Sequence, residues 1–436
     1  MQPRQDRPGS GFTALHLVQP VDGGVAQVVL DLVGAQVAAG IRVVVGCPEE
    51  GPLAPAAVRR GAEVHDWRAT RAPGPALVRE VRQAARLVRL VRPDLVHAHS
   101  AKAGLAGRLA VRGRVPTVFQ PHAWSFEAVG GVTGRLATRW ERLAVRWTDR
   151  VICVSDAERR TGERAGIDAR WSVVRNGVET ARFAPAAALF PPPFDGSCEG
   201  SFEEACAGTY AGSYSSSLGD APGEGLADTA RARAALPMLA ALPPATPVVV
   251  CVGRLCRQKG QDILLRAWRQ VVRQLPGARL VLVGDGPDAA ALRRTAPDSV
   301  LFAGAVADTA PWYRAADLVV LASRWEGMAV APLEAMAGGR AVVLSDVDGA
   351  RESLPPGRES VCLTPPGDPA ALAAALGVLL NDAPLREAIG RESHHHVLST
   401  YDVRQTARAV ADVYREVTGR VAAAVPRTER REPILQ

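Results

Sequence analysis

Short apolar runs alternate with amphipathic helical patterns along most of the 436-residue chain, and this alternation constrains the fold more than any other feature. The runs of the first half are FTALHLV, RVVVGC, AEVHDW, DLVHAH, TVFQPH, RVICV and WSVVRN. After residue 235 the pattern starts again with PVVVCVG, ARLVLVG, SVLFAG, DLVVLAS, RAVVLS and SVCLT. Strands that alternate with helices form parallel sheets, and a chain of this length exceeds one ordinary core. The sequence therefore predicts two α/β domains, over residues 11–186 and 236–401.

The segment between the two halves, residues 187–235, interrupts this rhythm. It is rich in Gly, Ala, Ser, Pro and acidic residues and has no useful apolar period. Because such a composition buries little apolar surface, we expect a disordered insertion there. Residues 1–10 and 421–436 are expected to be flexible tails. A helical pattern over about 402–420 follows the last strand and could pack on either domain.

Composition and motif spacing exclude several classes of protein. No apolar run approaches the length of a membrane-spanning helix, and the N-terminus lacks a signal-peptide pattern. Seven cysteines without a C-x-x-C pair argue against a disulfide scaffold or a zinc site. His97 and His99 form an H-x-H pattern with no third ligand at a convincing spacing, and the D-x-D of Asp346 and Asp348 is a pattern common by chance. We expect a cytoplasmic protein with no metal site.

Basic residues are concentrated in the first half of the chain. The formal net charge is +7, and residues 1–186 hold 27 Arg and Lys against 17 Asp and Glu. This excess indicates an anionic partner, such as a membrane surface, a phosphorylated acceptor or nucleic acid. An arginine-rich surface in water is the alternative. We expect no nucleic-acid partner.

One basic helical pattern, GRLATRWERLAVRWTDR over residues 134–150, bears on this choice. Leu136, Trp140, Leu143 and Trp147 follow helical spacing, and a stripe of arginines runs beside them. A basic amphipathic helix with tryptophans can lie on an anionic membrane. The same pattern fits a domain helix with a buried apolar face and arginines in water. The sequence leaves both interpretations open.

The turn GRLCRQKGQ, residues 253–261, holds one of only two lysines in the chain. Arg254 and Lys259 follow a buried apolar run and precede a helical pattern, and ligands of open parallel sheets bind at such turns. Cations at a helix start oppose the helix dipole, so an anion would relieve the conflict. The planar fork of Arg254 and the point charge of Lys259 together suit a diphosphate. Ordinary surface cations are the alternative. The other lysine, Lys102, follows DLVHAHSA, where a structural or an acceptor-facing role is expected.

Two turns of the first half offer further candidates. Gly23 and Gly24 follow the first strand and open a helix, so their backbone could approach a ligand and offer N–H groups to an anion. A tight turn without a ligand is the alternative. His122 ends the strand TVFQPH, where a histidine can face a ligand or be structural.

The stretch LASRWEGMAVAPLEAMAGG, residues 321–339, carries two carboxylates around a predicted helix start at Gly327. Glu326 and Glu334 are eight residues apart. A carboxylate here could accept hydrogen bonds from sugar hydroxyls, whereas two acids flanking one bond would suit glycoside hydrolysis. A solvated helix residue is the plain alternative for either glutamate alone.

Taken together, these turns resemble a retaining glycosyltransferase of family 4. The motifs are G-R-x4-K-G at 253–260, LVLVGDGP at 280–287, E-x7-E at 326–334 followed by AMAGG, DGGVAQVVLDL, RVICVSD and VVRNGV. The resemblance implies the GT-B fold, in which two Rossmann-like domains face each other and a C-terminal helix crosses back to the N-terminal domain. The N-terminal domain would then bind the acceptor and the C-terminal domain the nucleotide-sugar. It also implies metal-independent transfer of a hexose from a nucleotide-sugar to a saccharide or lipid-linked acceptor, without a further cofactor. We expect a UDP-sugar ahead of a GDP-sugar, and a role in cell-surface or exopolysaccharide biosynthesis, peripheral to the inner face of the membrane.

By the same resemblance, the catalytic group comprises Arg254 and Lys259 on the donor diphosphate, Glu326 on the donor sugar and His122 on the sugar from the other domain. The remaining donor contacts implied are Glu334 to the ribose, Val306 near the base, the backbone of Gly327, Met328 and Ala329 at the diphosphate, and Gly23 and Gly24 beside it. The chain departs from the family pattern at Gly338, at Arg340-Ala341 and at Asp348-Gly349, which surround the charged residues and bear on the choice of donor, not on the reaction class.

Two rival classes remain. A nucleotide-sugar epimerase or hydrolase of the same fold would convert the donor without an acceptor. A non-enzymatic bilobal sugar-binding protein would also have two α/β lobes, but it predicts an export signal and no phosphate-binding cations.

Overall fold

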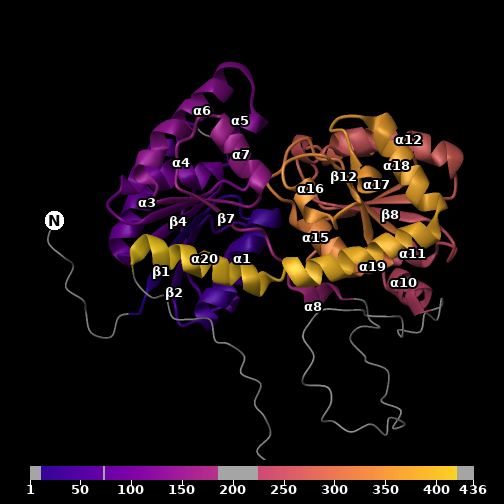
Figure 1. The fold of residues 1–436 in the computed structure, drawn as a ribbon, viewed down its shortest axis with the longest axis horizontal. Helices are drawn as coiled ribbons and strands as arrows, with labels where there is room; N and C mark the ends of the chain where they lie inside the picture. Colours follow the sequence, from indigo (N-terminus) through magenta and orange to yellow (C-terminus); the bar gives the residue numbers. More distant parts are fainter. Residues whose placement is uncertain (1–10, 72–73, 185–223, 420–436) are drawn as a thin grey trace, which may run out of the picture.

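Two parallel sheets build the protein, as the alternating pattern predicts. The computed structural model describes residues 11–71, 74–184 and 224–419. The first sheet has the strand order β3-β2-β1-β4-β5-β6-β7 and the second has the order β10-β9-β8-β11-β12-β13. In each sheet the first three strands in sequence extend in one direction and the later strands extend in the other, from the junctions β1–β4 and β8–β11. This is the arrangement of doubly wound nucleotide-binding folds. Figure 1 shows the two sheets side by side, each covered by helices.

The first sheet is formed by residues 13–173. Its strands are β1 (Thr13–Val18), β2 (Arg42–Cys47), β3 (Glu63–Asp66), β4 (Leu95–His99), β5 (Thr117–Gln120), β6 (Arg150–Cys153) and β7 (Trp171–Val173). Its helices are α1 (Gly23–Ala38), α2 (Leu53–Arg59), α3 (Leu77–Val91), α4 (Ser100–Val111), α5 (Ser125–Ala128), α6 (Gly131–Ala144), the 3-10 turn η1 (Val145–Trp147), α7 (Asp156–Arg164) and α8 (Thr180–Phe183). The central strands are buried along their whole length, because helices cover both faces.

The second sheet is formed by residues 248–364. Its strands are β8 (Val248–Val252), β9 (Arg279–Val283), β10 (Val300–Gly304), β11 (Leu318–Leu321), β12 (Ala341–Ser345) and β13 (Leu363–Thr364). Its helices are α10 (Glu224–Ala234), α11 (Pro237–Ala240), the 3-10 turn η2 (Arg257–Lys259), α12 (Gln261–Gln274), α13 (Ala289–Thr295), α14 (Ala310–Ala315), α15 (Val330–Ala337), α16 (Ala350–Ser353), α17 (Glu359–Cys362), α18 (Pro369–Asn381) and α19 (Ala383–Thr400).

The last helix, α20 (Val403–Thr418), crosses from the second domain to the first and packs beside α1. At the crossing, Val178 N donates to Tyr401 O at 2.8 Å and Val403 N donates to Val178 O at 3.1 Å. The helix buries an apolar stripe that includes Val410, Val413 and Tyr414 against the first domain. Figure 1 shows α19 along the second domain and α20 along the first. The expected crossing helix is confirmed.

One part of the expected insertion is helical. Residues 187–223 lie outside the described residues, as do the expected tails at 1–10 and 421–436. Residues 224–234, however, form α10, so the expectation of disorder is wrong there. Buried polar contacts anchor this helix, because Arg233 pairs with Asp317 at 2.6 Å and donates to Ala315 O at 2.9 Å, and Thr229 accepts from Arg340 at 3.2 Å. A search for apolar periodicity has little chance of finding a helix that is held in this way.

Helix α6 buries only part of the apolar face that its pattern offers. Leu136 is 57% exposed and Leu143 is 41% exposed, whereas the buried positions are Glu141 and Ala144. Glu141 is buried because it accepts a hydrogen bond from Arg108 at 2.8 Å. Trp140 and Trp147 of the same pattern are half-buried, so the interpretation of a domain helix with a buried apolar face holds only in part. Among the described residues, no helix has both the length and the apolar character needed to cross a bilayer.

Candidate active site

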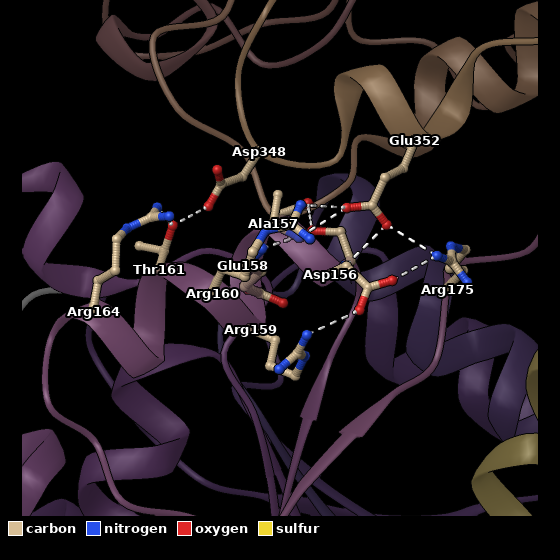
Figure 2. A network of polar contacts seen from close by, with 12 residues as sticks. Asp156, Ala157, Glu158, Arg159, Arg160, Thr161, Arg164, Arg175, Asp348 and Glu352 are labelled. Carbon is tan, nitrogen blue, oxygen red and sulfur yellow. Dashed lines mark hydrogen bonds and ion pairs between the residues drawn. The ribbon is translucent and has the colours of Figure 1, made fainter. Parts of the chain in front are cut away.

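The two domains meet through the start of α7. The N–H groups of Asp156 and Ala157 donate to the carboxylate of Glu352 in α16, at 2.9 and 2.8 Å, and Arg175 approaches the same carboxylate at 3.1 Å. Figure 2 shows Glu352 reaching down from the second domain onto this helix start. An anion at a helix N-terminus is stabilised by the free N–H groups and by the dipole. The contact therefore holds the carboxyl ends of the two sheets against each other.

The acidic pair Asp346 and Asp348 takes part in separate contacts. Asp348 Oδ2 accepts a hydrogen bond from Thr161 of α7 at 2.7 Å, which adds to the domain contact in Figure 2. Asp346 instead pairs with Arg351 at 2.5 Å. Gly349 has a φ of 75°, and a Cβ there would lie 2.2 Å from Gly327 O, so the backbone requires glycine at this position. Where the family pattern has a glycine pair, this chain keeps the second glycine and replaces the first by Asp348.

The predicted cationic turn lies where β8 ends, and Lys259 reaches the predicted Glu326 beyond β11. Lys259 Nζ pairs with Glu326 Oε1 at 2.5 Å, and Ser323 Oγ donates to the same oxygen at 2.7 Å. Strands β8 and β11 are neighbours at the point where the order of the second sheet reverses. Ligands of doubly wound sheets bind in the crevice at this point. The sequence predicted both side chains for this site but not their ion pair.

A glycine brings the cationic turn so close to β11. Gly260 has a φ of 67°, and a Cβ there would lie 2.0 Å from Ala322 O. Any side chain at this position would push the turn away from the strand. Gly260 therefore sets the approach of Lys259 to Glu326.

Among the cations of this turn that the structure describes, Arg254 is the one with a buried nitrogen that has no hydrogen-bond partner. Its Nε is buried, and among the described residues no hydrogen bond or ion pair reaches its guanidinium group. Arg150, Arg314 and Arg340 also have a buried Nε without a partner, but their other guanidinium nitrogens donate hydrogen bonds. A buried donor without an acceptor is costly, so the geometry at Arg254 fits an anionic ligand.

Two helix starts face each other across the domain boundary. A Cβ on Gly24, at the start of α1, would lie 3.6 Å from Cγ2 of Val330, the first residue of α15. Gly23 has a φ of 70°, and nothing lies within 4 Å of the position that its Cβ would take. The structure therefore leaves open space beside Gly23, and Gly24 faces the start of α15.

The turn from Gly327 to Ala329 is held from the first domain. Ser155 Oγ donates to Gly327 O and Asn176 Nδ2 donates to Met328 O, each at 2.8 Å. Ala329 has an extended backbone and precedes the first turn of α15. With these carbonyls occupied, the N–H groups at the start of α15 are the part of the turn suited to an anion. A small pocket nearby is lined by residues that include Ser323, Glu326, Ala329, Ser345 and Asp348.

Glu334 lies one turn into α15. Its Oε2 accepts hydrogen bonds from Tyr313 at 2.8 Å and from Thr309 at 3.4 Å. Burial raises the pKa of Glu334, against the hydrogen bond from Tyr313 and the charge of Arg182. Val306 lies between β10 and α14 and packs, half-buried, against the core of this domain. The structure thus places Glu334 and Val306 away from the Lys259–Glu326 pair, on the side where α14 lies.

His122 lies just beyond β5 in an unusual backbone conformation. Its φ is 59° and that of Ala123 is 140°, both in the region that favours glycine. The next residue, Trp124, anchors the turn, since its ring is buried and its Nε1 donates to Glu158 O at 2.8 Å. Strain of this kind persists only where the surroundings enforce it, and it is concentrated at functional sites. A Cβ on Gly327 would lie 3.0 Å from the carbonyl carbon of His122, so the two predicted residues face each other across the boundary.

Two carboxyl groups that the sequence did not single out lie beside this turn. Burial raises the pKa of Glu158 to about 8 and that of Glu127 to about 7, and the charge of Asp348 adds to both shifts. Glu158 Oε2 accepts a hydrogen bond from Val154 N at 2.7 Å. No local motif marks these residues, because only the folded turn brings them together.

A cluster of buried histidines is another feature that the sequence did not reveal. The H-x-H of His97 and His99 has a third member, His16, because β1 pairs with β4 in the register His16↔His97. His16 Nδ1 and His99 Nε2 lie 2.9 Å apart. Two nitrogen ligands of one tetrahedral zinc ion would be about 3.3 Å apart, so this spacing fits a hydrogen bond better than a shared metal. Knowledge of the strand order would have revealed the cluster.

Comparison with known proteins agrees with this geometry. A family profile described as "Glycosyltransferase Family 4" matches residues 22–182, and one described as "Glycosyl transferases group 1" matches residues 246–382. The D-inositol 3-phosphate glycosyltransferase of Kineococcus radiotolerans is 30% identical over 362 residues, which cover 74% of this chain and 71% of that protein. The lipopolysaccharide core biosynthesis mannosyltransferase LpsB of Rhizobium meliloti is 28% identical over 291 residues, covering 64% of this chain and 69% of LpsB.

A solved structure supports the fold independently. Anabaena Alr3699/HepE, crystallised in complex with UDP and glucose, superposes with a TM-score of 0.69 at 23% identity and covers 92% of this chain and 98% of HepE. Both Rossmann-like sheets and the crossing helix α20 are expected of this architecture. The chain therefore belongs to glycosyltransferase family 4 and is a glycosyltransferase of the GT-B fold.

Proposed function

We propose that the protein moves a sugar from a nucleotide-sugar to a hydroxyl of a saccharide or lipid-linked acceptor, with retention of anomeric configuration. The observation that carries this proposal is the unpartnered guanidinium of Arg254, buried at Nε, in the same turn as Lys259. A diphosphate would supply the acceptor atoms that Arg254 lacks. The start of α15 would supply further N–H groups to the same anion.

Electrostatic stabilisation of the leaving group is then the main catalytic contribution. As the bond from the sugar to the diphosphate breaks, negative charge grows on the diphosphate, and Arg254 and Lys259 oppose it in a crevice with little water. These two cations supply the charge that a metal ion would otherwise provide, so the proposed reaction needs no metal and no further cofactor.

The ion pair between Lys259 and Glu326 links donor binding to recognition of the sugar. In the structure described above, Glu326 Oε1 is occupied by Lys259 and Ser323. When Lys259 turns to the diphosphate, this oxygen becomes available to a sugar hydroxyl. Glu334 and Val306 would hold the ribose and the base farther along the crevice, and His122 would contact the sugar from the first domain.

The donor is proposed to be a UDP-sugar ahead of a GDP-sugar. HepE was crystallised with UDP and glucose, whereas LpsB is named a mannosyltransferase, so a mannose donor is the rival. A thermal-shift screen with UDP-glucose, UDP-galactose and GDP-mannose, each with EDTA, tests this choice. Stabilisation by a UDP-sugar is expected. If no nucleotide-sugar stabilises the protein, the transfer proposal is contradicted.

The acceptor is proposed to be a lipid-linked or cell-surface saccharide, reached from the cytoplasmic side of a membrane. Helix α6 exposes Val132, Leu136 and Leu143, and arginines such as Arg135 and Arg139 lie between them. An exposed apolar stripe with flanking arginines suits the interface of an anionic bilayer. LpsB, which acts in lipopolysaccharide core biosynthesis, is consistent with such an acceptor.

Co-sedimentation with vesicles tests the membrane contact. We expect binding to phosphatidylglycerol vesicles at low salt and much less binding to phosphatidylcholine. The double variant Leu136→Glu and Leu143→Glu should lose binding while keeping the melting temperature, because both side chains are exposed. Absence of binding to anionic vesicles at low salt contradicts the membrane proposal.

Product analysis separates transfer from the rival reactions of the same fold. A donor labelled in the sugar is incubated with and without a lipid-linked saccharide, and the products are identified by mass spectrometry and NMR. Transfer predicts an α-linked product from an α-linked donor, and only when the acceptor is present. Free sugar or an epimerised donor without acceptor would favour a hydrolase or an epimerase.

A further inference from the structure

Four imidazole rings form a continuous chain that ends at the proposed active site. His16 Nδ1 lies 2.9 Å from His99 Nε2, and His99 Nδ1 lies 3.2 Å from His122 Nε2. His97 lies against His99, with ring centroids 3.9 Å apart. The rings meet because His97 and His99 point to one face of β4, and β1 places His16 beside His97 on that face.

Two helices provide the polar end of this chain. Gln36 of α1 lies with Oε1 2.8 Å from His16 Nε2 and donates from its Nε2 to Tyr414 OH at 3.4 Å. Tyr414, which α20 carries across from the second domain, lies 2.7 Å from His97 Nδ1. The histidine chain is therefore tied to the helix that connects the two domains.

All four rings are neutral at physiological pH. Burial lowers the pKa of His16 to about 4 and that of His122 to about 3. Burial, together with the neighbouring histidines, lowers the pKa of His97 and His99 well below the usual value. A neutral imidazole has one N–H donor and one bare nitrogen that accepts, so each ring can pass a hydrogen bond in one direction only.

The direction follows from Gln36. Its Oε1 can only accept, so the hydrogen of His16 is on Nε2 and its Nδ1 is bare. His99 must then donate from Nε2 to His16, which leaves Nδ1 of His99 bare. His122 must in turn donate from Nε2 to His99, so Nδ1 of His122 keeps its lone pair.

We propose that His99 and His16 are positioning residues that hold His122 in its Nε2–H tautomer, with Nδ1 as a hydrogen-bond acceptor for a sugar hydroxyl. This inference rests on the proposed function in placing the sugar beside His122. The hydrogen bond from His122 to His99 also fixes the ring on a backbone whose φ of 59° few residues adopt. A second nitrogen that is fixed by a buried partner is the usual means of orienting a functional imidazole.

Two substitutions of His99 separate its two contacts. The amide of a glutamine extends to the place of Nε2, and that of an asparagine lies near Nδ1. His99→Gln therefore keeps the contact with His16 and loses the one with His122, whereas His99→Asn does the reverse. We expect His99→Gln to lower kcat about tenfold to a hundredfold with little change in the KM for the donor, and His99→Asn to remain near the native kcat.

Nitrogen-15 NMR reads the tautomer of His122 without any substrate. Long-range proton–nitrogen correlations of the uniformly labelled native protein should show His122 protonated at Nε2 only. His99→Gln should give a mixture of tautomers and His99→Asn should keep the native pattern. His97→Asn is the matched control, since His97 is equally buried but does not contact His122, and this variant should leave the His122 signals unchanged.

The outcomes test the histidine relay, meaning the hydrogen bonds that join His16, His99 and His122, separately from the proposed function. Protonation of His122 at Nδ1 in the native protein overturns the relay, as does a native His122 spectrum and native kcat in a folded His99→Gln. If His99→Gln fails to fold, the spectrum of the native protein still decides the question. If His122→Ala keeps full transfer, the role of His122 in the proposed function is wrong, although the relay itself can still be detected by NMR.

Discussion

The chain has two lysines, and each pairs with a glutamate, but the surroundings of the two pairs differ. Lys102 Nζ lies 2.6 Å from Glu80 Oε2 between α4 and α3, with side chains 2% and 0% exposed. Lys259 Nζ lies 2.5 Å from Glu326 Oε1 at the domain boundary, with side chains 20% and 8% exposed. Scarcity of lysine therefore does not by itself mark a catalytic residue.

The environment of each carboxylate distinguishes the two roles. Glu80 also accepts hydrogen bonds from Thr70 N at 2.8 Å and from Thr70 Oγ1 at 3.0 Å. Burial opposes the charged form, but these bonds and Lys102 outweigh it and keep the pKa of Glu80 below its usual value. Glu326 shares one oxygen between Lys259 and Ser323, and the unpartnered Arg254 belongs to the same turn as Lys259. A fully enclosed pair is costly to break, whereas a pair at the edge of a crevice can exchange partners with a ligand.

Removing Lys102 should have the largest effect on stability. Lys102→Ala leaves the charge of Glu80 buried without its cation, which costs about 3–5 kcal/mol in the free energy of unfolding. Urea denaturation measures this loss, and the folded fraction should keep the native kcat. The double variant Lys102→Met and Glu80→Gln should regain most of the stability, because the amide oxygen of the new glutamine can still accept from Thr70. A Lys102→Ala protein as stable as the native one would show that the two lysine–glutamate pairs do not differ in their effect on stability.

Removing Lys259 should have the opposite profile. Lys259→Ala should lower kcat of transfer about a hundredfold to a thousandfold, because a charge on the leaving diphosphate is lost. The melting temperature should fall less than in Lys102→Ala, since Lys259 is partly exposed and Glu326 keeps its hydrogen bond from Ser323. Lys259→Arg, which keeps the charge but not its compact geometry, should fall between the two. Near-native kcat in Lys259→Ala would remove Lys259 from the proposed mechanism.

Removing Arg254 should weaken nucleotide binding by a smaller factor. Charge-assisted hydrogen bonds contribute about 1.5–3 kcal/mol, so Arg254→Met should raise the Kd for the nucleotide about tenfold to a hundredfold. Arg257→Met is the matched control, because Arg257 is an exposed cation of the same turn whose guanidinium lies 5.8 Å from the Trp325 ring. Isothermal titration calorimetry measures both variants. Equal losses in the two would mean that only the net charge of the turn matters.

The pH dependence of the free energy of unfolding should distinguish the buried Lys102–Glu80 pair from the buried histidines. His16 has a pKa near 6.5 when unfolded and about 4 when folded, so the unfolded chain binds the proton first and the contribution of His16 to stability falls as pH drops from 6.5 to about 4. The slope is about 1.4 kcal/mol per pH unit for each such histidine, and His97 and His99 add to it. Glu80, whose pKa in the folded protein lies below the unfolded value of 4.5, adds to the slope only as the pH approaches 4.5 and falls below it.

Unfolding by urea at several pH values tests this point. His16→Gln should reduce the slope of the free energy of unfolding against pH by the contribution of one histidine. The double variant Lys102→Met with Glu80→Gln should change this slope little above pH 5. The raised pKa values of Glu127 and Glu158 give slopes of the opposite sign in this range, so the difference between the variant and the native protein is the test. An unchanged slope in His16→Gln would show that His16 is not held neutral by the fold.

Residues that act through neighbours in sequence could be predicted, and those that act through neighbours in space could not. Arg254, Lys259 and Glu326 follow buried strands, so the sequence alone places them at one edge of a sheet. His16 and His99 meet only because β1 and β4 pair in a given register. Helix α10 depends on the contact of Arg233 with Asp317, which is 84 residues away. The exposed face of α6 depends on Arg108 drawing Glu141 inward. Such contacts leave no local pattern.

The crossing helix α20 also has a consequence for how such proteins can be inherited. The first domain is discontinuous in the gene, because α20 is encoded after the whole second domain and yet packs on α1 and supplies Tyr414 to His97. Recombination that exchanged the second domain with a single junction would bring a foreign α20 with it. A hybrid that preserves the first domain needs two junctions, one before β8 and one near Tyr401. New donor specificities are therefore expected to spread between genes as an internal cassette and not as a C-terminal half.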